Sequence, residues 1–196
     1  MKYQISKLLF LFLISGSVLL NSSCSSPALD DYSDSQFELI NQNGETVLFP
    51  DDFEGAPLVI GFIYTHCPDI CSFITANISS VYEELDDPGN TQFVLVTFDP
   101  ERDTPEVLKQ YANAFQMDRE PFHFLTGDPE TVASFMQRVS VRTQESYSRE
   151  LDDGERVYFL NHSDKILLID SRSRLIFDYG GSMTPVSIII EDLKKL

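Results

Sequence analysis

The chain has 196 residues, of which 42% are hydrophobic and 12% aromatic, and its formal net charge at pH 7 is −17. A chain of this length can bury the core of one domain of ordinary size. The acidic excess argues against nucleic acid as a partner, because like charges would repel its phosphates. It fits a cationic partner, a metal ion or a well-solvated surface.

Residues 1–23 resemble the export signal of a bacterial lipoprotein. A positively charged start precedes an apolar run over residues 8–20, which is shorter than the roughly 20 residues that a membrane-spanning helix needs. Cys24 then follows small residues, although Asn21 stands where an aliphatic residue is usual. We expect Cys24 to become an acylated N-terminus that anchors an exported protein to a membrane, facing the periplasm or the cell exterior. Ordinary cleavage nearby and an uncleaved N-terminal anchor are the alternatives.

Residues 24–35 are rich in Ser and Asp and contain one Pro, a composition that predicts a flexible tether. The remaining residues, 36–196, predict one domain without internal repeats. This domain is expected to begin with a hairpin, in which strands over 36–41 and 46–49 flank the turn signal Asn43-Gly44.

Apolar segments alternate with helical segments in the middle of the chain. The predicted strands cover residues 58–64, 92–98 and 122–125, and the predicted helices cover residues 72–85, 105–116 and 129–139. The last two helices begin with the cap signals Thr104-Pro105 and Asp128-Pro129. Such alternation predicts a mostly parallel sheet with helices on both faces, in which the first two strands are neighbours.

The C-terminal part predicts a second hairpin, over residues 165–179, and a last helix that runs from Thr184-Pro185 to Leu196. We expect this hairpin to lie on the free side of the 58–64 strand. The complete domain is then an α/β fold with a central mixed sheet flanked by helices. Before the hairpin, residues 146–155 are acidic and polar and predict an exposed loop or hairpin.

Two cysteines, Cys67 and Cys71, lie where the 58–64 strand ends and the next helix begins. A helix N-terminus carries partial positive charge, which favours the thiolate form. Residues four apart share one helix face, so both sulfurs can point at the same spot and lie within reach of a disulfide. The pair predicts a reversible disulfide, a metal clamp, or each in turn. Two buried structural cysteines are the alternative.

Three separated segments resemble the Sco/SenC family of thioredoxin-like copper proteins. They are residues 65–71 (Thr-His-Cys-Pro-Asp-Ile-Cys), 97–104 (Thr-Phe-Asp-Pro-Glu-Arg-Asp-Thr) and 160–163 (Leu-Asn-His-Ser). The resemblance covers roughly residues 36–196. It implies a thioredoxin-like fold and a role in assembling the binuclear copper site of cytochrome c oxidase.

The resemblance also implies that copper, as Cu(I) or Cu(II), is held by Cys67, Cys71 and His162. Soft thiolates select Cu(I), and imidazole also tolerates Cu(II), whereas structural zinc sites normally close with four protein ligands. Three ligands leave room for a ligand from a partner, either the copper-site subunit of cytochrome c oxidase or another copper-transfer protein. Ser72 departs from the family, which usually has Pro there, but this removes no ligand.

Other polar residues near these motifs have weaker claims to a role. His66 adjoins Cys67 and could raise its thiolate character, but such a neighbour more often points away. His123 lies between two Phe residues of a predicted strand and is expected to be tolerated or exposed. Asp99 either tunes the site or pairs with Arg102, and the structural pairing is favoured.

The main rival function is that of a thiol–disulfide oxidoreductase, in which Cys67 and Cys71 keep the copper-site cysteines of the oxidase reduced without delivering copper. That chemistry needs no imidazole, so His162 discriminates between the two functions. A peroxidase would need one activated cysteine in a supporting site and does not explain the histidine. A passive electron or copper carrier is a further alternative. The favoured function is a metallochaperone with linked redox activity.

Overall fold

The computed structural model describes residues 27–152, 154 and 156–196, so the expected signal peptide and Cys24 lie outside the described residues. The strands are β1 (Asp30–Asp31), β2 (Phe37–Asn41), β3 (Thr46–Phe49), β4 (Leu58–Ile63), β5 (Gln92–Thr97), β6 (Phe122–Thr126), β7 (Thr143–Glu150), β8 (Arg156–His162), β9 (Ile166–Ile169) and β10 (Arg174–Tyr179). The helices are α1 (Cys71–Glu84), α2 (Pro105–Ala114), α3 (Pro129–Arg138) and α4 (Val186–Leu193), with a short 3-10 helix, η1 (Asp51–Phe53).

An eight-stranded mixed sheet with the order β1-β10-β9-β4-β5-β6-β2-β3 forms the centre of the fold. As predicted, β4 pairs in parallel with β5 and in antiparallel with β9 of the C-terminal hairpin. Among the residues that the structure describes, parallel pairing is confined to the β4–β5 and β5–β6 neighbours, so the prediction of a mostly parallel sheet was wrong. The two hairpins extend the sheet by antiparallel strands on both sides, which confirms the predicted mixed sheet.

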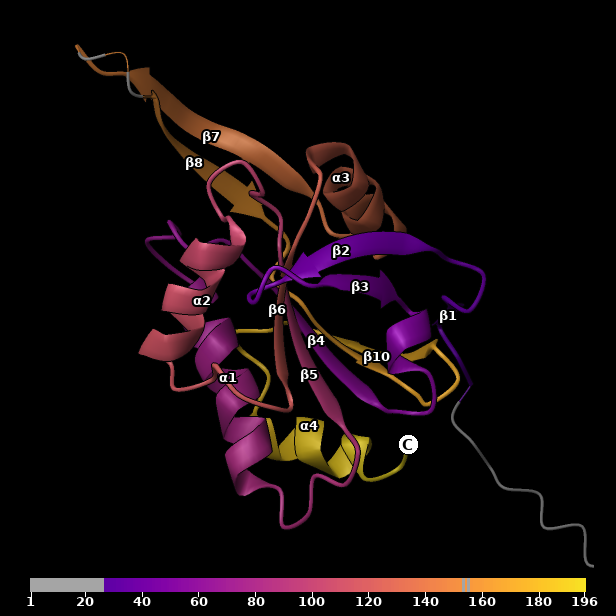
Figure 1. Ribbon diagram of the computed structural model, residues 1–196. Coiled ribbons are helices and arrows are strands. Elements are labelled where there is room, and N and C mark those ends of the chain that lie inside the picture. Colours follow the sequence, from indigo (N-terminus) through magenta and orange to yellow (C-terminus); the bar gives the residue numbers. More distant parts are fainter. Residues whose placement is uncertain (1–26, 153, 155) are drawn as a thin grey trace, which may run out of the picture.

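Helices cover both faces of this sheet. A Cβ added to Gly61 of β4 would meet side-chain atoms of Ile78 and Ile74 at 2.5 and 3.0 Å, so this face of β4 packs against α1. The next residue, Phe62, points to the other face and lies 6.5 Å, between ring centroids, from Phe135 of α3. Figure 1 shows α1, α2 and α4 on one side of the sheet and α3 on the other.

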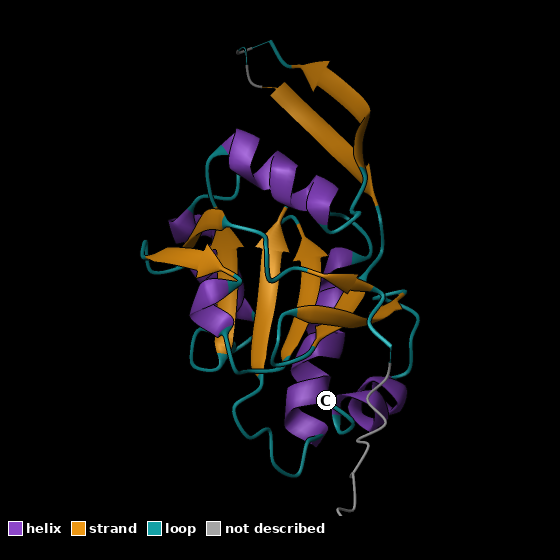
Figure 2. Ribbon diagram, turned by 90° about the vertical axis from the view of Figure 1, so that its right-hand side faces the viewer, coloured by secondary structure: helices purple, strands orange, loops and turns teal. Residues whose placement is uncertain are grey.

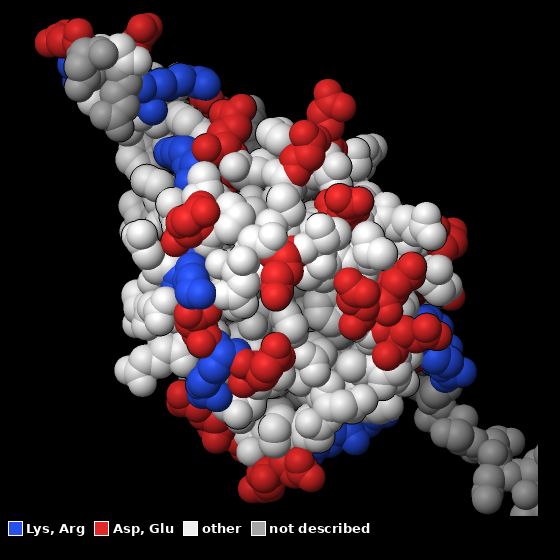
Figure 3. Space-filling model, viewed as in Figure 1, with Lys and Arg blue, Asp and Glu red and all other residues white. Residues whose placement is uncertain are grey.

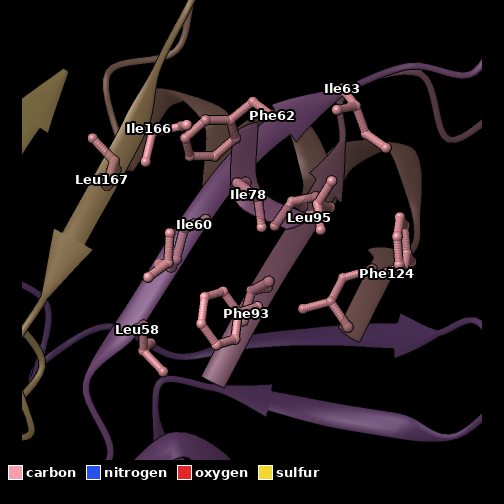
Figure 4. Packing of buried hydrophobic residues seen from close by; sticks show 14 of the residues in the cluster. Leu58, Ile60, Phe62, Ile63, Ile78, Phe93, Leu95, Phe124, Ile166 and Leu167 are labelled. Atoms are coloured by element: carbon pink, nitrogen blue, oxygen red, sulfur yellow. The ribbon is translucent and has the colours of Figure 1, made fainter. Parts of the chain in front are cut away.

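The core consists of the apolar side chains of the central strands and of the helix faces above them. Every residue of β4 is buried, which is typical of a strand covered on both faces. Figure 4 shows the side chains of β4, β5 and β6 next to one another, with Ile78 of α1 among them. The continuous apolar run before the cysteines therefore does form the predicted core strand.

Phe135 lies at the centre of an aromatic cluster on the α3 side, with ring centroids 5.2 Å from Phe37 and 5.0 Å from Phe49. Its side chain is fully buried. We expect Phe135→Ala to lower the free energy of unfolding by about 3–5 kcal/mol, because it removes buried surface and leaves a cavity. Chemical denaturation measures this. Phe73→Ala, at a residue that is 60% exposed, is the control and should change the stability by less than about 0.5 kcal/mol. Equal effects would contradict this assignment of the core.

The predicted helix caps are present, but some of the helices differ from the predicted ranges at their ends. Thr104 Oγ1 accepts a hydrogen bond from the Val107 amide at the start of α2. Asp128 Oδ1 accepts from the Glu130 amide at the start of α3. However, α1 begins at Cys71 rather than one residue later, and α4 is shorter than predicted at both of its ends.

The described part of the predicted tether is docked onto the domain. β1 pairs with β10, and Tyr32 is buried, with the Arg138 guanidinium 4.5 Å from its ring centroid. Arg138 also forms an ion pair with Asp30 at 2.7 Å. These contacts fall within the predicted tether, residues 24–35, and its Ser/Asp-rich composition does not reveal them.

β7 and β8 form a separate two-stranded ribbon that projects from the body of the molecule (Figure 2). The acidic, polar composition of residues 146–155 predicted a loop or hairpin there, whereas the strands extend over residues 143–150 and 156–162. All residues of β7 are exposed. The strand therefore lacks the alternation of apolar and polar residues from which a strand can be predicted.

Acidic side chains are spread over the face of the molecule seen in Figure 3, while Lys and Arg lie mainly along its edges and on the ribbon. This distribution fits the net charge of −17. Among the described residues, no helix is both long and apolar enough to cross a membrane.

Candidate metal centre

Three elements bring Cys67, Cys71 and His162 together. Cys67 lies in the turn after β4, Cys71 is the first residue of α1, and His162 is the last residue of β8. The Nε2 atom of His162 lies 3.9 Å from Sγ of Cys67 and 3.5 Å from Sγ of Cys71. Within the part of the chain that the structure describes, this is the one group of three or more His, Cys, Asp or Glu side chains arranged to hold a metal ion.

The two cysteines are free thiols that differ in exposure. Cys71 is 1% exposed, whereas Cys67 is only half-buried. Cys67 is therefore the more exposed thiol of the pair. Its amide donates a hydrogen bond of 3.2 Å to the carbonyl of Tyr64, which closes the turn between the strand and the helix. This turn places both sulfurs on the same side of the helix start.

Burial changes the expected protonation of Cys71. It raises the pKa of this thiol well above the ordinary value, chiefly because the buried thiolate would lose its hydration. Desolvation therefore opposes the tendency toward the thiolate that the start of a helix gives to a cysteine. A soft metal ion binds the thiolate and must displace this proton, so metal binding becomes tighter as the pH rises.

A backbone carbonyl fixes the orientation of the His162 ring. Nδ1 of His162 lies 2.9 Å from the carbonyl oxygen of Ser163, which can only accept, so Nδ1 carries the proton and donates it. The lone pair is then on Nε2, the atom that faces both sulfurs. This is the usual outer-shell arrangement of a metal-binding histidine. The donor set of two sulfurs and one imidazole nitrogen fits a soft or borderline metal ion such as copper.

Aromatic rings shield the imidazole from solvent. The ring of Phe98 lies 4.6 Å from that of His162, and the ring of Tyr64 lies 6.0 Å away, both between centroids. Tyr64 and Phe98 directly follow the parallel strands β4 and β5, and both side chains are buried. The site therefore lies at the carboxyl edge of the parallel strands, where α/β folds place their ligands.

The buried side chain of Asp103 stabilises the turn between β4 and α1. Its carboxylate accepts hydrogen bonds from the Thr65 amide at 3.0 Å and from the hydroxyls of Thr65 and Thr97, both at 2.5 Å. The side chain is fully buried, and burial raises its pKa despite these bonds. Only the fold places Asp103 next to Thr65, so these partners could not be predicted from the motif that contains it.

The other candidate residues lie outside the group of three. The side chain of His66 is 54% exposed, and its Nδ1 lies 3.1 Å from the hydroxyl of Thr65. His123 is half-buried at the other end of β6, where its Nε2 lies 2.9 Å from the side-chain oxygen of Gln92. Ser72 is exposed, and its hydroxyl donates to the carbonyl of Asp69 at 3.3 Å. Asp99 forms an ion pair of 2.5 Å with Arg102, as favoured from the sequence.

A family model covers both this fold and this site. The family model described as SCO1/SenC matches residues 26–196. The chain belongs to the SCO1/SenC family. A relative, the SCO2-like protein of Rickettsia felis, is 33% identical over 155 residues, which cover 78% of this chain and 72% of the relative.

Solved SCO1/SenC structures confirm the thioredoxin-like fold. ScoI of Bradyrhizobium japonicum, solved with copper bound, is 28% identical, with a TM-score of 0.65 and coverage of 82% of this chain and 96% of that one. A SCO1/SenC family lipoprotein from Bacillus anthracis is 29% identical, with a TM-score of 0.64 and coverage of 82% and 92%. The family resemblance inferred from the three sequence motifs is thereby confirmed.

Proposed function

We propose that this protein is a copper-binding metallochaperone that assists assembly of the binuclear copper site of cytochrome c oxidase. Cys67, Cys71 and His162 would hold the copper as cargo, and the same two thiols would carry out linked dithiol–disulfide chemistry. The partner would be the copper-site subunit of the oxidase or another copper-transfer protein.

One observation carries this proposal. The Nε2 atom of His162 faces the sulfurs of Cys67 and Cys71 at 3.9 and 3.5 Å, and the hydrogen bond from Nδ1 to the Ser163 carbonyl favours the tautomer with its lone pair on Nε2. A thiol–disulfide exchange site needs no such imidazole. Copper bound to the related ScoI of Bradyrhizobium japonicum supports the same conclusion.

The number of ligands suits transfer. Two sulfurs and one nitrogen leave a coordination position for a donor atom of the acceptor protein, so copper could pass through a shared intermediate without becoming free. Cys67, the more exposed thiol, would be the first contact of such a partner. The buried Cys71 would keep its hold longest.

The second candidate function is a thiol–disulfide oxidoreductase, which the unequal exposure of the two cysteines favours. The Cys67 thiolate would attack a disulfide of the partner and form a mixed disulfide. The Cys71 thiolate would then attack Cys67, which forms the internal disulfide and releases the partner with both thiols reduced. This reaction uses two electrons from the Cys67–Cys71 dithiol.

Assembly of the oxidase in cells that lack the native protein separates the two functions. If copper delivery is the function, cells that carry His162→Ala and cells that carry Cys71→Ser should both fail to mature the oxidase. If His162→Ala restores full assembly while Cys71→Ser does not, the metallochaperone proposal gives way to the thiol reductase. The abundance of each variant must be checked, because loss of protein would mimic loss of function.

We also propose that Cys24 is lipidated and anchors the domain to the outer surface of a membrane, facing the periplasm or the cell exterior. The apolar run followed by small residues and Cys24 supports this, as does the description of the Bacillus anthracis relative as a lipoprotein. Cys24→Ser should leave the precursor uncleaved or release the domain from the membrane, and mass spectrometry of the mature N-terminus measures this. An unmodified N-terminus at another residue in the native protein would refute lipidation.

A further inference from the structure

The ribbon that carries His162 needs an anchor outside its own hydrogen bonds. Among the described residues, β7 and β8 pair only with each other, and neither joins the eight-stranded sheet. An isolated two-stranded hairpin is at best marginally stable in water. A groove of about 1340 Å³ separates part of the ribbon from α3, and His162 lines it. Contacts on the inner side of β8 must therefore set the position of His162 relative to the two cysteines.

Arg102 makes two of these contacts. Its guanidinium carbon lies 3.6 Å from the ring centroid of Tyr158 on β8, and its Nη1 donates a hydrogen bond of 3.0 Å to the main-chain carbonyl of the same residue. Stacking on the ring and bonding to the backbone fix both the distance and the rotation of the strand. Tyr158 is buried and lies four positions before His162 on the same strand.

Asp99 holds the guanidinium in this position. Its Oδ2 accepts from Nε of Arg102 at 2.5 Å and pairs with Nη2 at 2.5 Å, while its Oδ1 accepts from the Tyr158 hydroxyl at 2.6 Å. Asp99 is 4% exposed, so the charged pair is shielded from water. The three side chains close a ring of contacts between the end of β5 and the middle of β8. We call Asp99, Arg102 and Tyr158 the Arg102 clamp.

A second contact links β8 to the cysteine turn itself. The amide of Leu160 donates a hydrogen bond of 3.3 Å to the hydroxyl of Tyr64. The main-chain carbonyl of Tyr64 accepts a hydrogen bond from the amide of Cys67, and the Arg102 guanidinium carbon lies 5.6 Å from the centroid of the Tyr64 ring. The clamp thus meets the segment that carries Cys67 on one side and the strand that carries His162 on the other.

We propose that Arg102 is a positioning residue for the metal site: together with Asp99 and Tyr158 it holds β8 so that Nε2 of His162 faces the two sulfurs. Arg102 is not one of the three residues that would hold the metal ion. This inference rests on the proposed function, because His162 is assigned there as a copper ligand. It predicts that loss of the Arg102 clamp removes the contribution of His162 to Cu(II) binding and leaves the chemistry of Cys67 and Cys71 unchanged.

Arg102→Lys tests the clamp, because a lysine keeps the charge but cannot bind Asp99 through two nitrogens, stack on Tyr158 and reach its carbonyl at once. In the metal-free protein, we expect the ring-proton NMR signals of His162 to move toward those of an exposed histidine, away from the field of the Phe98 ring. Cu(II) should bind about 10- to 100-fold more weakly, as for other outer-shell changes. Cu(I) binding and formation of the Cys67–Cys71 disulfide should stay as in the native protein.

Arg174→Lys is a matched control. Arg174 forms an ion pair of 2.5 Å with Asp170 through two nitrogens, in the turn of the C-terminal hairpin. Its side chain is 23% exposed, compared with 19% for Arg102. This variant should lose thermal stability as Arg102→Lys does, yet keep the native His162 signals and the native Cu(II) affinity.

The proposal is overturned if Arg102→Lys leaves the His162 signals and the Cu(II) affinity unchanged, or if Arg174→Lys alters them equally. If Arg102→Lys does not fold, Tyr158→Phe replaces it, because it removes only the hydroxyl bonded to Asp99. That variant should move the same signals in the same direction by a smaller amount, and no movement would overturn the clamp. The NMR signals need no copper. A native protein that binds no copper would therefore refute the proposed function while the clamp is still tested.

Discussion

His162→Ala should weaken Cu(II) binding far more than Cu(I) binding, while the Cys67–Cys71 disulfide still forms on mild oxidation. The two sulfurs suffice to hold a soft Cu(I) ion, whereas Cu(II) depends on the imidazole nitrogen. Substitution of residues that only orient a ligand weakens metal binding by about 10- to 100-fold. We expect a larger loss of Cu(II) affinity here, since a direct ligand is removed. Competition with chelators of known affinity measures both oxidation states, and thiol counting measures the disulfide.

The two other histidines provide controls for this experiment. His66 adjoins Cys67 but is largely exposed, and His123 is bonded to Gln92 at the far end of β6. Neither His66→Ala nor His123→Ala should change Cu(II) affinity appreciably. Equal losses in all three variants would mean that the histidines act through stability or net charge, and the assignment of His162 as a ligand would fail.

Cys71→Ser should abolish stoichiometric binding of both Cu(I) and Cu(II) and prevent the internal disulfide. Serine is nearly the same size, so the buried position at the start of α1 stays filled, but its hydroxyl is a hard and neutral donor. The remaining thiol and imidazole offer only two ligands. Metal analysis after gel filtration of the reduced protein measures the loss, and circular dichroism verifies the fold.

Ser72→Ala is the matched control for this substitution, because it removes one hydroxyl from the next, exposed residue of the same helix. It should bind one copper per chain like the native protein. Retention of native copper binding by Cys71→Ser would mean that the ion binds elsewhere. The site built from Cys67, Cys71 and His162 would then be wrong.

Local patterns in the sequence predicted the elements that build the site, and tertiary contacts decided the rest. The apolar run of β4 and the caps Thr104 and Asp128 act within a few residues, so they can be read directly from the chain. β7 could not be recognised in this way, because all of its side chains are exposed and no periodicity results. The docking of Tyr32 depends on Arg138, more than 100 residues away in the chain (138 − 32 = 106).

In the candidate site, too, some features could be predicted from local sequence and others depend on the fold. Cys67 and Cys71 could be paired from their spacing, but His162 is 91 residues beyond Cys71 and was assigned through its motif. The tautomer of His162 depends on the main-chain carbonyl of Ser163, which no side-chain pattern encodes. The burial that raises the pKa of Cys71 depends on the whole fold, whereas the helix dipole is a local property that can be read from the sequence.

X-ray absorption spectroscopy of the reduced, copper-loaded protein tests the central claim most directly, because it identifies the atoms bound to the metal. The arrangement of Cys67, Cys71 and His162 predicts one copper per chain with two sulfur ligands and one imidazole nitrogen. In His162→Ala the nitrogen signal should disappear while both sulfurs stay. A copper ion surrounded only by nitrogen and oxygen, or a nitrogen signal that survives in His162→Ala, would contradict the account.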